Sequence, residues 1–311
     1  MLHVLVLGAA AGGGFPQWNC NDDANRRARA DDPNVRARTQ SSIAVSADGK
    51  RWVVLNASPD LRQQINDNKA LHPAAGDPKR ASPIAAVVVT NADVDHVTGL
   101  LNLRESQPFA LYGHRRVLGV LSQNSIFNVL NPNFVDRRPL PLDVPVALAD
   151  KAGAPLGVTV TAFIVPGKIA LWLEDLNAPG FGSQAGDTIG LMLTGADGSD
   201  PVFYIPGCAS MPPELKDRLN GAALAFFDGT LWRDDEMIAS GAGVKSGQRM
   251  GHMSCSGPDG VIAAFEELDV RRKVLIHLNN TNPLLIDNSP ECAEAKAAGW
   301  EVAYDGMELR V

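Results

Sequence analysis

The sequence predicts an α/β fold, and three features support this class. Apolar runs rich in β-branched residues, of which residues 84–89 are the clearest, have the length of strands buried on both faces. Segments with helical patterns lie between several of these runs. Two pairs of strand-like segments are separated by turn signals, Asp48-Gly49 and residues 195–198, which predict antiparallel hairpins.

Strands are expected where apolar residues run without a break or alternate with polar ones. These segments are residues 2–7, 41–45, 51–55, 84–89, 109–112, 158–164, 189–193, 202–205, 222–227, 273–278 and 300–304. Helices are expected at residues 61–68, 97–104, 115–122 and 290–298. Residues 22–38 are charged and poor in apolar side chains, and residues 131–148 contain several prolines, so both segments are predicted to be irregular.

Composition excludes several classes of protein. A chain of 311 residues with 45% hydrophobic content can bury a large core, as one large domain or as two halves. The net charge of −7, without basic runs, disfavours nucleic acid as a partner. No apolar stretch approaches the roughly 18 residues of a membrane span, and the apolar N-terminus lacks the basic start of a signal peptide. We therefore expect a cytoplasmic protein.

The cysteines give no sign of a disulfide scaffold. Cys20, Cys208, Cys255 and Cys292 are dispersed and form no CxxC pair. Cys208 is interpreted either as a soft metal ligand or as a small buried residue.

The strand at residues 84–89 delivers a cluster of ligand-type side chains. Asp93, Asp95 and His96 follow its end within four residues, at the mouth of a sheet where α/β sites form. Asp93 could instead cap the next helix, and the histidine could simply be packed and hydrogen-bonded. A bound cation offsets so much concentrated negative charge most economically, so we predict a metal site.

Two glycine-containing segments are expected near this site. Residues 12–14 are glycines without the GxGxxG spacing of a dinucleotide site, so we interpret them as a loop whose backbone approaches a ligand, and Gln17 and Trp18 follow directly. Residues 240–251, also rich in glycine, are predicted to be a flap over the site.

Asn91-x-Asp93-x-Asp95-His96 resembles the HxHxDH signature of the metallo-β-lactamase superfamily, with both leading histidines replaced. Over the whole chain the sequence is similar to the pyrroloquinoline quinone (PQQ) biosynthesis protein B family. The matching blocks are residues 12–20, 38–42, 56–60, 90–100, 165–168, 205–208, 227–230, 251–253 and 277–283. This resemblance implies a single domain over residues 1–311 with the four-layer αβ/βα sandwich of the superfamily.

The resemblance also implies which ligands remain. One superfamily site is degraded here, because Asn91 replaces a histidine, no histidine follows residues 158–164 and Cys208 replaces a bridging aspartate. The other site keeps Asp95, His96 and His277, and two histidines with one carboxylate form the ligand set of non-haem Fe(II) oxygenases. The expected cofactor is therefore Fe(II), although zinc or another divalent ion could occupy the site in the isolated protein.

Further site residues are expected around this set. Asp93 would be a fourth ligand or would hydrogen-bond a metal-bound water, and His252 and Asp228 would transfer protons or contact substrate. The residues expected to bind substrate are Gln17, Trp18, Ser41, Asn279 and Asn280.

The family commonly carries a CxCxxC pattern, which resembles a structural zinc site, but Asp22 and Asn25 occupy its second and third cysteine positions here. One thiolate cannot complete a tetrahedral zinc site, so no structural zinc is expected, and Cys20 with Asp22 could hold only a weakly bound ion.

The family supplies the substrate class, which is PQQ or its small-molecule precursor. The ligand set fits iron-dependent hydroxylation of the tyrosine ring in a cross-linked Glu-Tyr precursor. A soluble carrier of PQQ or its precursor toward the periplasm is the alternative, and a metal-dependent hydrolase is the least favoured. A homodimer is compatible with the sequence.

Overall fold

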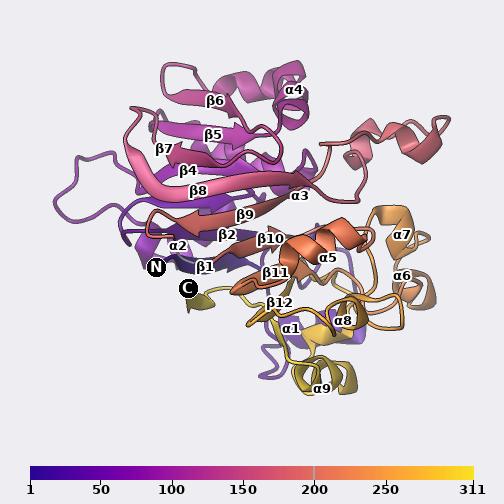
Figure 1. Cartoon of the computed structure of the whole chain (residues 1–311). Coiled ribbons are helices and arrows are strands. Elements are labelled where there is room, and N and C mark those ends of the chain that lie inside the picture. The colour runs from indigo at the N-terminus through magenta and orange to yellow at the C-terminus, as the bar shows by residue number, and fades with distance from the viewer. Residues whose placement is uncertain (199) are drawn as a thin grey trace.

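The computed structural model describes residues 1–198 and 200–311, and within them two seven-stranded sheets pack face to face (Figure 1). The first sheet has the order β14-β1-β2-β3-β4-β5-β6 and the second the order β13-β12-β11-β10-β9-β8-β7. In each sheet, four neighbouring strands are antiparallel and the remaining pairs are parallel. The two sheets therefore repeat one arrangement.

The strands of the first sheet are β1 (His3–Gly8), β2 (Ser42–Ser46), β3 (Trp52–Leu55), β4 (Ile84–Val89), β5 (Phe109–Gly113), β6 (Val135–Pro139) and β14 (Glu308–Arg310). Those of the second are β7 (Val146–Ala149), β8 (Pro155–Ile164), β9 (Ile189–Gly195), β10 (Val202–Ile205), β11 (Leu224–Asp228), β12 (Lys273–Ile276) and β13 (Trp300–Val302). The α-helices are α1 (Asp23–Arg29), α2 (Leu61–Asp67), α3 (Val94–Val97), α4 (Arg115–Gln123), α5 (Pro213–Leu219), α6 (Glu236–Ala239), α7 (Gly247–Met250), α8 (Val261–Ala264) and α9 (Pro290–Ala297).

Alternation along the strands separates the layers. In β4, Ala86 and Val88 belong to the core between the two sheets, whereas Val87 and Val89 belong to a second core under α2 and α4. Successive strand side chains point to opposite faces, so a strand covered on both faces is apolar throughout. The predicted αβ/βα four-layer sandwich is thereby confirmed.

Most predicted strands and both hairpins are present, and the two segments predicted to be irregular were misjudged. Residues 131–148 contain β6 and β7, which are edge strands of their sheets. An edge strand tolerates proline, and Pro139 is the last residue of β6. Residues 22–38 contain α1, whose N-cap is Asp22. The side chain of Asp22 accepts a hydrogen bond from the backbone N–H of Asn25 (2.7 Å), which satisfies a free amide of the first turn.

The helix predicted at residues 97–104 is divided into α3 and the 3₁₀ helix η2 (Thr98–Leu103). A β-carbon at Gly99 would lie 2.0 Å from the backbone oxygen of Ser58, so only glycine allows this close approach. The division keeps the loop after β4 tight against the end of β3, because Gly99 also donates its N–H to the Ala57 oxygen (2.9 Å).

Two long connections lie at one end of the sandwich. Residues 165–188, between β8 and β9, carry the 3₁₀ helices η4 (Leu171–Leu173) and η5 (Pro179–Gly182) and project from the body, and α6 and α7 lie near the same end (Figure 1). This is also where β4, β11 and β12 end. Among the described residues, no helix has both the length and the apolar character needed to cross a bilayer.

Candidate metal centre

The carboxyl ends of β4 and β12 deliver acidic and imidazole side chains to one cavity of about 330 Å³, which Thr230, after β11, also lines. Asp93, Asp95 and His96 follow β4, and His277 follows β12. His252 enters the cavity from the segment after α7. Loops at the carboxyl ends of strands are where open α/β sheets form their sites, so two chain segments distant in sequence meet here as predicted.

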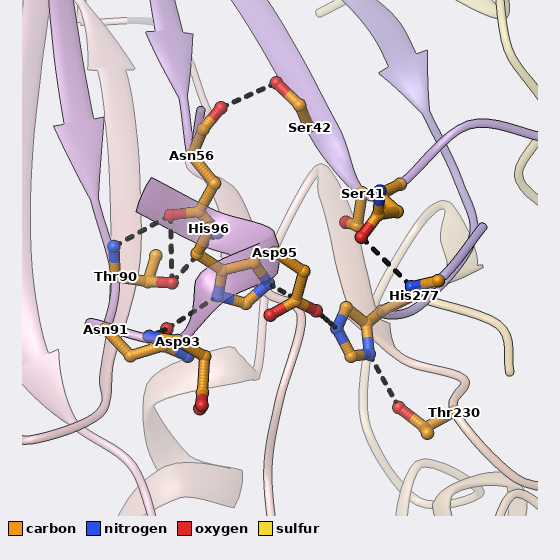
Figure 2. A network of polar contacts seen from close by, with 12 residues as sticks. Ser41, Ser42, Asn56, Thr90, Asn91, Asp93, Asp95, His96, Thr230 and His277 are labelled. Atoms are coloured by element: carbon orange, nitrogen blue, oxygen red, sulfur yellow. Dashed lines mark hydrogen bonds and ion pairs between the residues drawn. The ribbon is translucent and has the colours of Figure 1, made fainter. Parts of the chain in front are cut away.

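Asp95, His96 and His277 form a compact group whose side chains point toward one another (Figure 2). The His277 Nε2 atom lies 3.1 Å from Asp95 Oδ2, and His96 Nε2 lies 3.9 Å from the same oxygen. His277 has a positive φ of 66°, a strained conformation for a non-glycine residue that is typical of functional sites. A β-carbon at Gly12 would lie 3.3 Å from Asp95 Oδ2, so the glycine loop approaches this group closely.

Hydrogen bonds at Nδ1 determine which nitrogen of each imidazole is free. His96 Nδ1 lies 2.8 Å from Asn91 Oδ1, which can only accept, so Nδ1 carries the proton and Nε2 carries the lone pair. His96 Nε2 is buried and has no hydrogen-bond partner among the described residues. An unpaired buried acceptor is costly, and a metal ion would satisfy it.

A relay of hydrogen bonds orients His277 in the same way. The Thr230 hydroxyl donates to Asp228 Oδ1 (2.6 Å), so its oxygen accepts from His277 Nδ1 (2.8 Å). His277 Nε2 points toward Asp95 and donates a hydrogen bond to Oδ2 (3.1 Å), because a carboxylate oxygen can only accept. With Nδ1 bound to Thr230, Nε2 is the nitrogen of His277 that would bind a metal ion, and it would release its proton on doing so.

Burial and neighbouring charges keep His96 neutral and Asp95 ionised. Burial lowers the pKa of His96 to about 4, so this imidazole is neutral at physiological pH. Burial alone would raise the pKa of Asp95, but His96 and His277 outweigh it and hold the pKa of this carboxyl well below its usual range.

A second group adjoins the first and shares His277. Asp228, His252 and His277 also bring one potential ligand atom each within 4.8 Å of the others. His252 Nδ1 lies 2.7 Å from Asp228 Oδ2, and its ring stacks on His277 with centroids 5.2 Å apart. Burial opposes charge on His252, but the Asp228 carboxylate prevails and raises the pKa of His252.

Asp93 and Cys208 lie nearby in different roles. Asp93 lines the cavity, its Oδ1 accepts the N–H of Leu171 (2.9 Å), and burial raises the pKa of its carboxyl. Cys208 is fully buried, and its thiol donates to the Ser210 oxygen (3.1 Å). Burial raises the pKa of this thiol to about 12, and neither group of potential metal ligands among the described residues includes Cys208, which favours the interpretation as a small buried residue.

The structure places only some of the residues predicted to bind substrate on the cavity wall. Gln17 and Asn279 line the cavity. Trp18 is 87% exposed, and Asn280 lines a neighbouring pocket that shares Gln17 with the cavity. Ser41 is buried between the sheets, where its hydroxyl lies 3.3 Å from that of Tyr204. The side chains of Trp18, Ser41 and Asn280 are not part of the cavity wall.

Three site residues were not identified from the sequence. Thr230 sets the tautomer of His277, Asn56 joins the end of β3 to Thr90 through a bond from Thr90 N (2.9 Å), and Lys245 lines the cavity. Thr230 and Asn56 lie within the matching blocks 227–230 and 56–60, and Lys245 lies within the predicted flap, but no pattern indicated the role of any of the three. Asn56 has a positive φ of 61°, which asparagine tolerates better than most residues.

The loop with the degenerate CxCxxC pattern is held by an asparagine. Asn25 is fully buried, and its Oδ1 accepts the N–H of Gln17 (2.7 Å). Its Nδ2 donates to Asp22 Oδ1 (2.8 Å) and to the Asn280 oxygen (3.3 Å). Asn25 thus ties the loop that carries Gln17 to the loop after β12.

Comparison with known proteins identifies the family. A profile described as the beta-lactamase superfamily domain matches residues 51–278. Coenzyme PQQ synthesis protein B from Gluconacetobacter diazotrophicus is 57% identical over 309 residues, which are 99% of each chain. The chain belongs to the family of coenzyme PQQ synthesis protein B. The family member from Xanthomonas oryzae pv. oryzae is 52% identical over 308 residues, again 99% of each chain.

Solved structures agree with this PqqB assignment. A crystal structure of Zn²⁺-bound PqqB from Methylobacterium extorquens superposes with a TM-score of 0.93 and 47% identity, covering 99% of this chain and 100% of that one. A diphosphatase of the PhnP family superposes with a TM-score of 0.70 and 18% identity over 100% of this chain and 98% of its own, a likeness that concerns the fold alone.

A buried glutamate of α6, Glu236, should make the stability of this PqqB family member depend on pH. Burial raises the pKa of Glu236 to about 7, although its carboxylate accepts hydrogen bonds from Thr281 Oγ1 and Trp232 N, both 2.6 Å. The folded state therefore binds this proton more tightly than the unfolded state. The stabilisation that this proton gives the folded state is complete below pH 4.5, the pKa in the unfolded state, and is lost as pH rises toward 7. The free energy of unfolding should fall by up to about 3 kcal/mol over this range.

Urea unfolding at pH 5, 6, 7 and 8 measures this effect. Glu236→Gln should flatten the fall of unfolding free energy between pH 5 and 7, relative to the unmodified protein. Glu214→Gln, an exposed glutamate of α5, is the matched control and should leave the profile unchanged. Parallel profiles for the unmodified protein and Glu236→Gln would contradict the prediction.

Proposed function

We propose that this protein acts in PQQ synthesis as a mononuclear, non-haem Fe(II)-dependent oxygenase that hydroxylates the tyrosine ring of a cross-linked Glu-Tyr precursor. The observation that carries the proposal is the group of Asp95, His96 and His277, in which His96 Nε2 is buried and has no hydrogen-bond partner within the described part of the chain. Two histidines and one carboxylate on one face of an ion leave coordination positions open.

The residues present fit a divalent ion, and Asp95, His96 and His277 would hold it. Bound Fe(II) would supply the dioxygen chemistry that amino acid side chains do not provide. The M. extorquens relative is described as Zn²⁺-bound, and zinc lacks redox chemistry, so the identity of the functional metal is part of the test.

A two-metal hydrolase is disfavoured by what replaces its ligands. Asn91, at a superfamily histidine position, is occupied in orienting His96. Cys208, at the position of a bridging aspartate, keeps its proton and bonds Ser210. A two-metal mechanism needs a second complete ligand set and a bridge, which these residues do not supply.

His252 and Asp228 are proposed to handle the proton of the substrate phenol. Asp228 is fully buried and holds His252 through Nδ1, which leaves Nε2 of this cavity-lining residue for substrate. Because the Asp228 carboxylate raises the pKa of His252, this imidazole can accept and hold a proton near neutral pH. Leu171, Met237 and Met250 line the same cavity and would exclude water from the ring.

The proposal is tested by loading the protein with Fe(II) without oxygen and then adding the synthetic precursor and air. We expect about one iron per chain, oxygen consumption that depends on the precursor, and a hydroxylated product. Equal turnover with zinc, or hydrolysis of the precursor, would overturn the oxygenase. Tight PQQ binding by metal-free protein, without oxygen consumption by the iron-loaded protein, would favour a carrier.

The role of His252 has a separate test. His252→Ala should lower kcat by about 100-fold or more, the range in which positioned acids and bases contribute. Its iron content should remain that of the unmodified protein, because Asp95, His96 and His277 are intact. Full activity in this variant would remove His252 from the mechanism, and loss of iron would make it a ligand instead.

A further inference from the structure

The cavity is lined by charged groups of both signs. Asp93 and Asp95 lie at the metal centre, whereas Lys168 and Lys245 line the cavity from the two long connections at this end of the sandwich. Opposite charges in one cavity can distinguish the two ends of a bound molecule, because each end experiences a different electrostatic potential. The lysines are therefore candidates for substrate recognition.

The two lysines differ in what they already contact. Lys168 Nζ lies 2.8 Å from Glu174 Oε1, and the side chain of Glu174 is only 5% exposed. Glu174 is also bound by Arg249 Nη2 at 2.7 Å. Lys245, in contrast, forms no hydrogen bond or ion pair through its ammonium group with any residue that the structure describes. Its charge is thus free for a ligand.

The segment that carries Lys245 is held over the cavity from both sides. Arg249 binds Glu174 and stacks on the Phe181 ring, with its guanidinium carbon 3.6 Å from the ring centroid. Gln248 Nε2 donates to the Ala209 oxygen (2.8 Å). A β-carbon at Gly251 would lie 3.0 Å from Lys168 Cγ, so the backbone packs directly on that lysine. These contacts position Lys245 without using its ammonium group.

We propose that Lys245 is the specificity-determining residue that binds a carboxylate of the substrate, while the ring of the same molecule lies toward Asp95, His96 and His277. An ammonium group offers three donors to a carboxylate, and a charge-assisted hydrogen bond in a partly buried site is stronger than a neutral one. The apolar side chains of Met237 and Met250 also line the cavity and suit an aromatic ring. The inference rests on the proposed function in treating this cavity as the substrate site.

The test compares two probes that differ only in charge, 4-hydroxyphenylpropionate and its amide. Their binding to the full-length, zinc-loaded protein is measured by titration calorimetry or by ligand-observed NMR, without oxygen or turnover. The unmodified protein should bind the acid about tenfold more tightly than the amide, as expected for one hydrogen bond to a charged group. Lys245→Met should remove this preference, and Lys245→Arg should retain most of it.

Lys50→Met, at an exposed lysine of the β2–β3 turn, is the matched control and should behave as the unmodified protein. Circular dichroism of each variant checks that the fold is retained. Equal affinity of the unmodified protein for acid and amide, binding of neither probe, or an unchanged preference in Lys245→Met would overturn the proposal. Because no turnover is measured, failure of the oxygenase reaction would leave this result intact.

Discussion

Replacing Asp95 by asparagine should weaken the binding of a divalent metal ion by at least about 100-fold. Loss of an outer-shell partner typically costs 10- to 100-fold in metal affinity, and Asp95 is the carboxylate that both His96 Nε2 and His277 Nε2 face. The substitution keeps the size of the side chain but removes its negative charge. Competition with a chelator of known affinity, for Zn²⁺ and for Fe(II) without oxygen, measures the change.

Glu214→Gln makes the same chemical change at an exposed position and should leave metal affinity unchanged. A second variant, Asn91→Ala, separates ligands from orienting residues. This substitution removes the hydrogen-bond acceptor of His96 Nδ1 and should lower metal affinity by about 10- to 100-fold, less than the substitution of Asp95 does. If Asp95→Asn bound metal as tightly as the control, the assignment of this group as the metal centre would fail.

The meeting of Asp95 and His96 with His277 was predicted from the family resemblance, whereas the strand patterns placed each of these residues only at a strand end. A strand buried on both faces is recognisable from its apolar run, and residues after the strand lie at its end. Residues 84–89 and 273–278 both met this condition. The strands β4 and β12 belong to different sheets, so their apolar runs alone do not show that these ends meet, and the superfamily signature was needed to pair them.

The orientation of His277 could not be predicted, because it depends on a residue with no spacing relation to this histidine. Thr230 sets the free nitrogen of His277 only because its own hydroxyl is committed to Asp228. In the same way, Trp18 and Ser41 follow segments that do lie near the cavity, yet their side chains point elsewhere. The direction of a side chain on an irregular loop is determined by tertiary contacts, which no local pattern records.

Asn91 shows how a single substitution changes the role of a position. The superfamily signature places a histidine ligand there, and its absence suggested only a degraded site. The structure places Asn91 Oδ1 between His96 Nδ1 (2.8 Å) and the backbone N–H of Asp93 (3.0 Å). One amide oxygen therefore orients a ligand and fixes the loop that carries it. A position lost to one metal site can thus serve the geometry of the other.

Asp228 should be among the costliest buried residues to remove. Its fully buried carboxylate accepts hydrogen bonds from Cys208 N (2.7 Å), Thr230 N (3.0 Å), Thr230 Oγ1 (2.6 Å) and His252 Nδ1 (2.7 Å). Asp228→Ala would leave these donors unpaired in the interior and should lower the free energy of unfolding by about 3–5 kcal/mol. Urea unfolding in the presence of a chelator measures this loss without a contribution from bound metal.

Glu301→Ala is the matched control, because Glu301 pairs with Arg272 (2.8 Å) at a position where both side chains are about 40% exposed. A surface pair of this kind contributes at most about 1 kcal/mol. The loss in free energy of unfolding for Asp228→Asn should lie between those of the two alanine variants. The single amide oxygen of asparagine can accept only some of the hydrogen bonds that the carboxylate accepts. A loss in Asp228→Ala no larger than in Glu301→Ala would mean that these donors find other partners. The relay from Asp228 through Thr230 would then not be what holds His277 in its orientation.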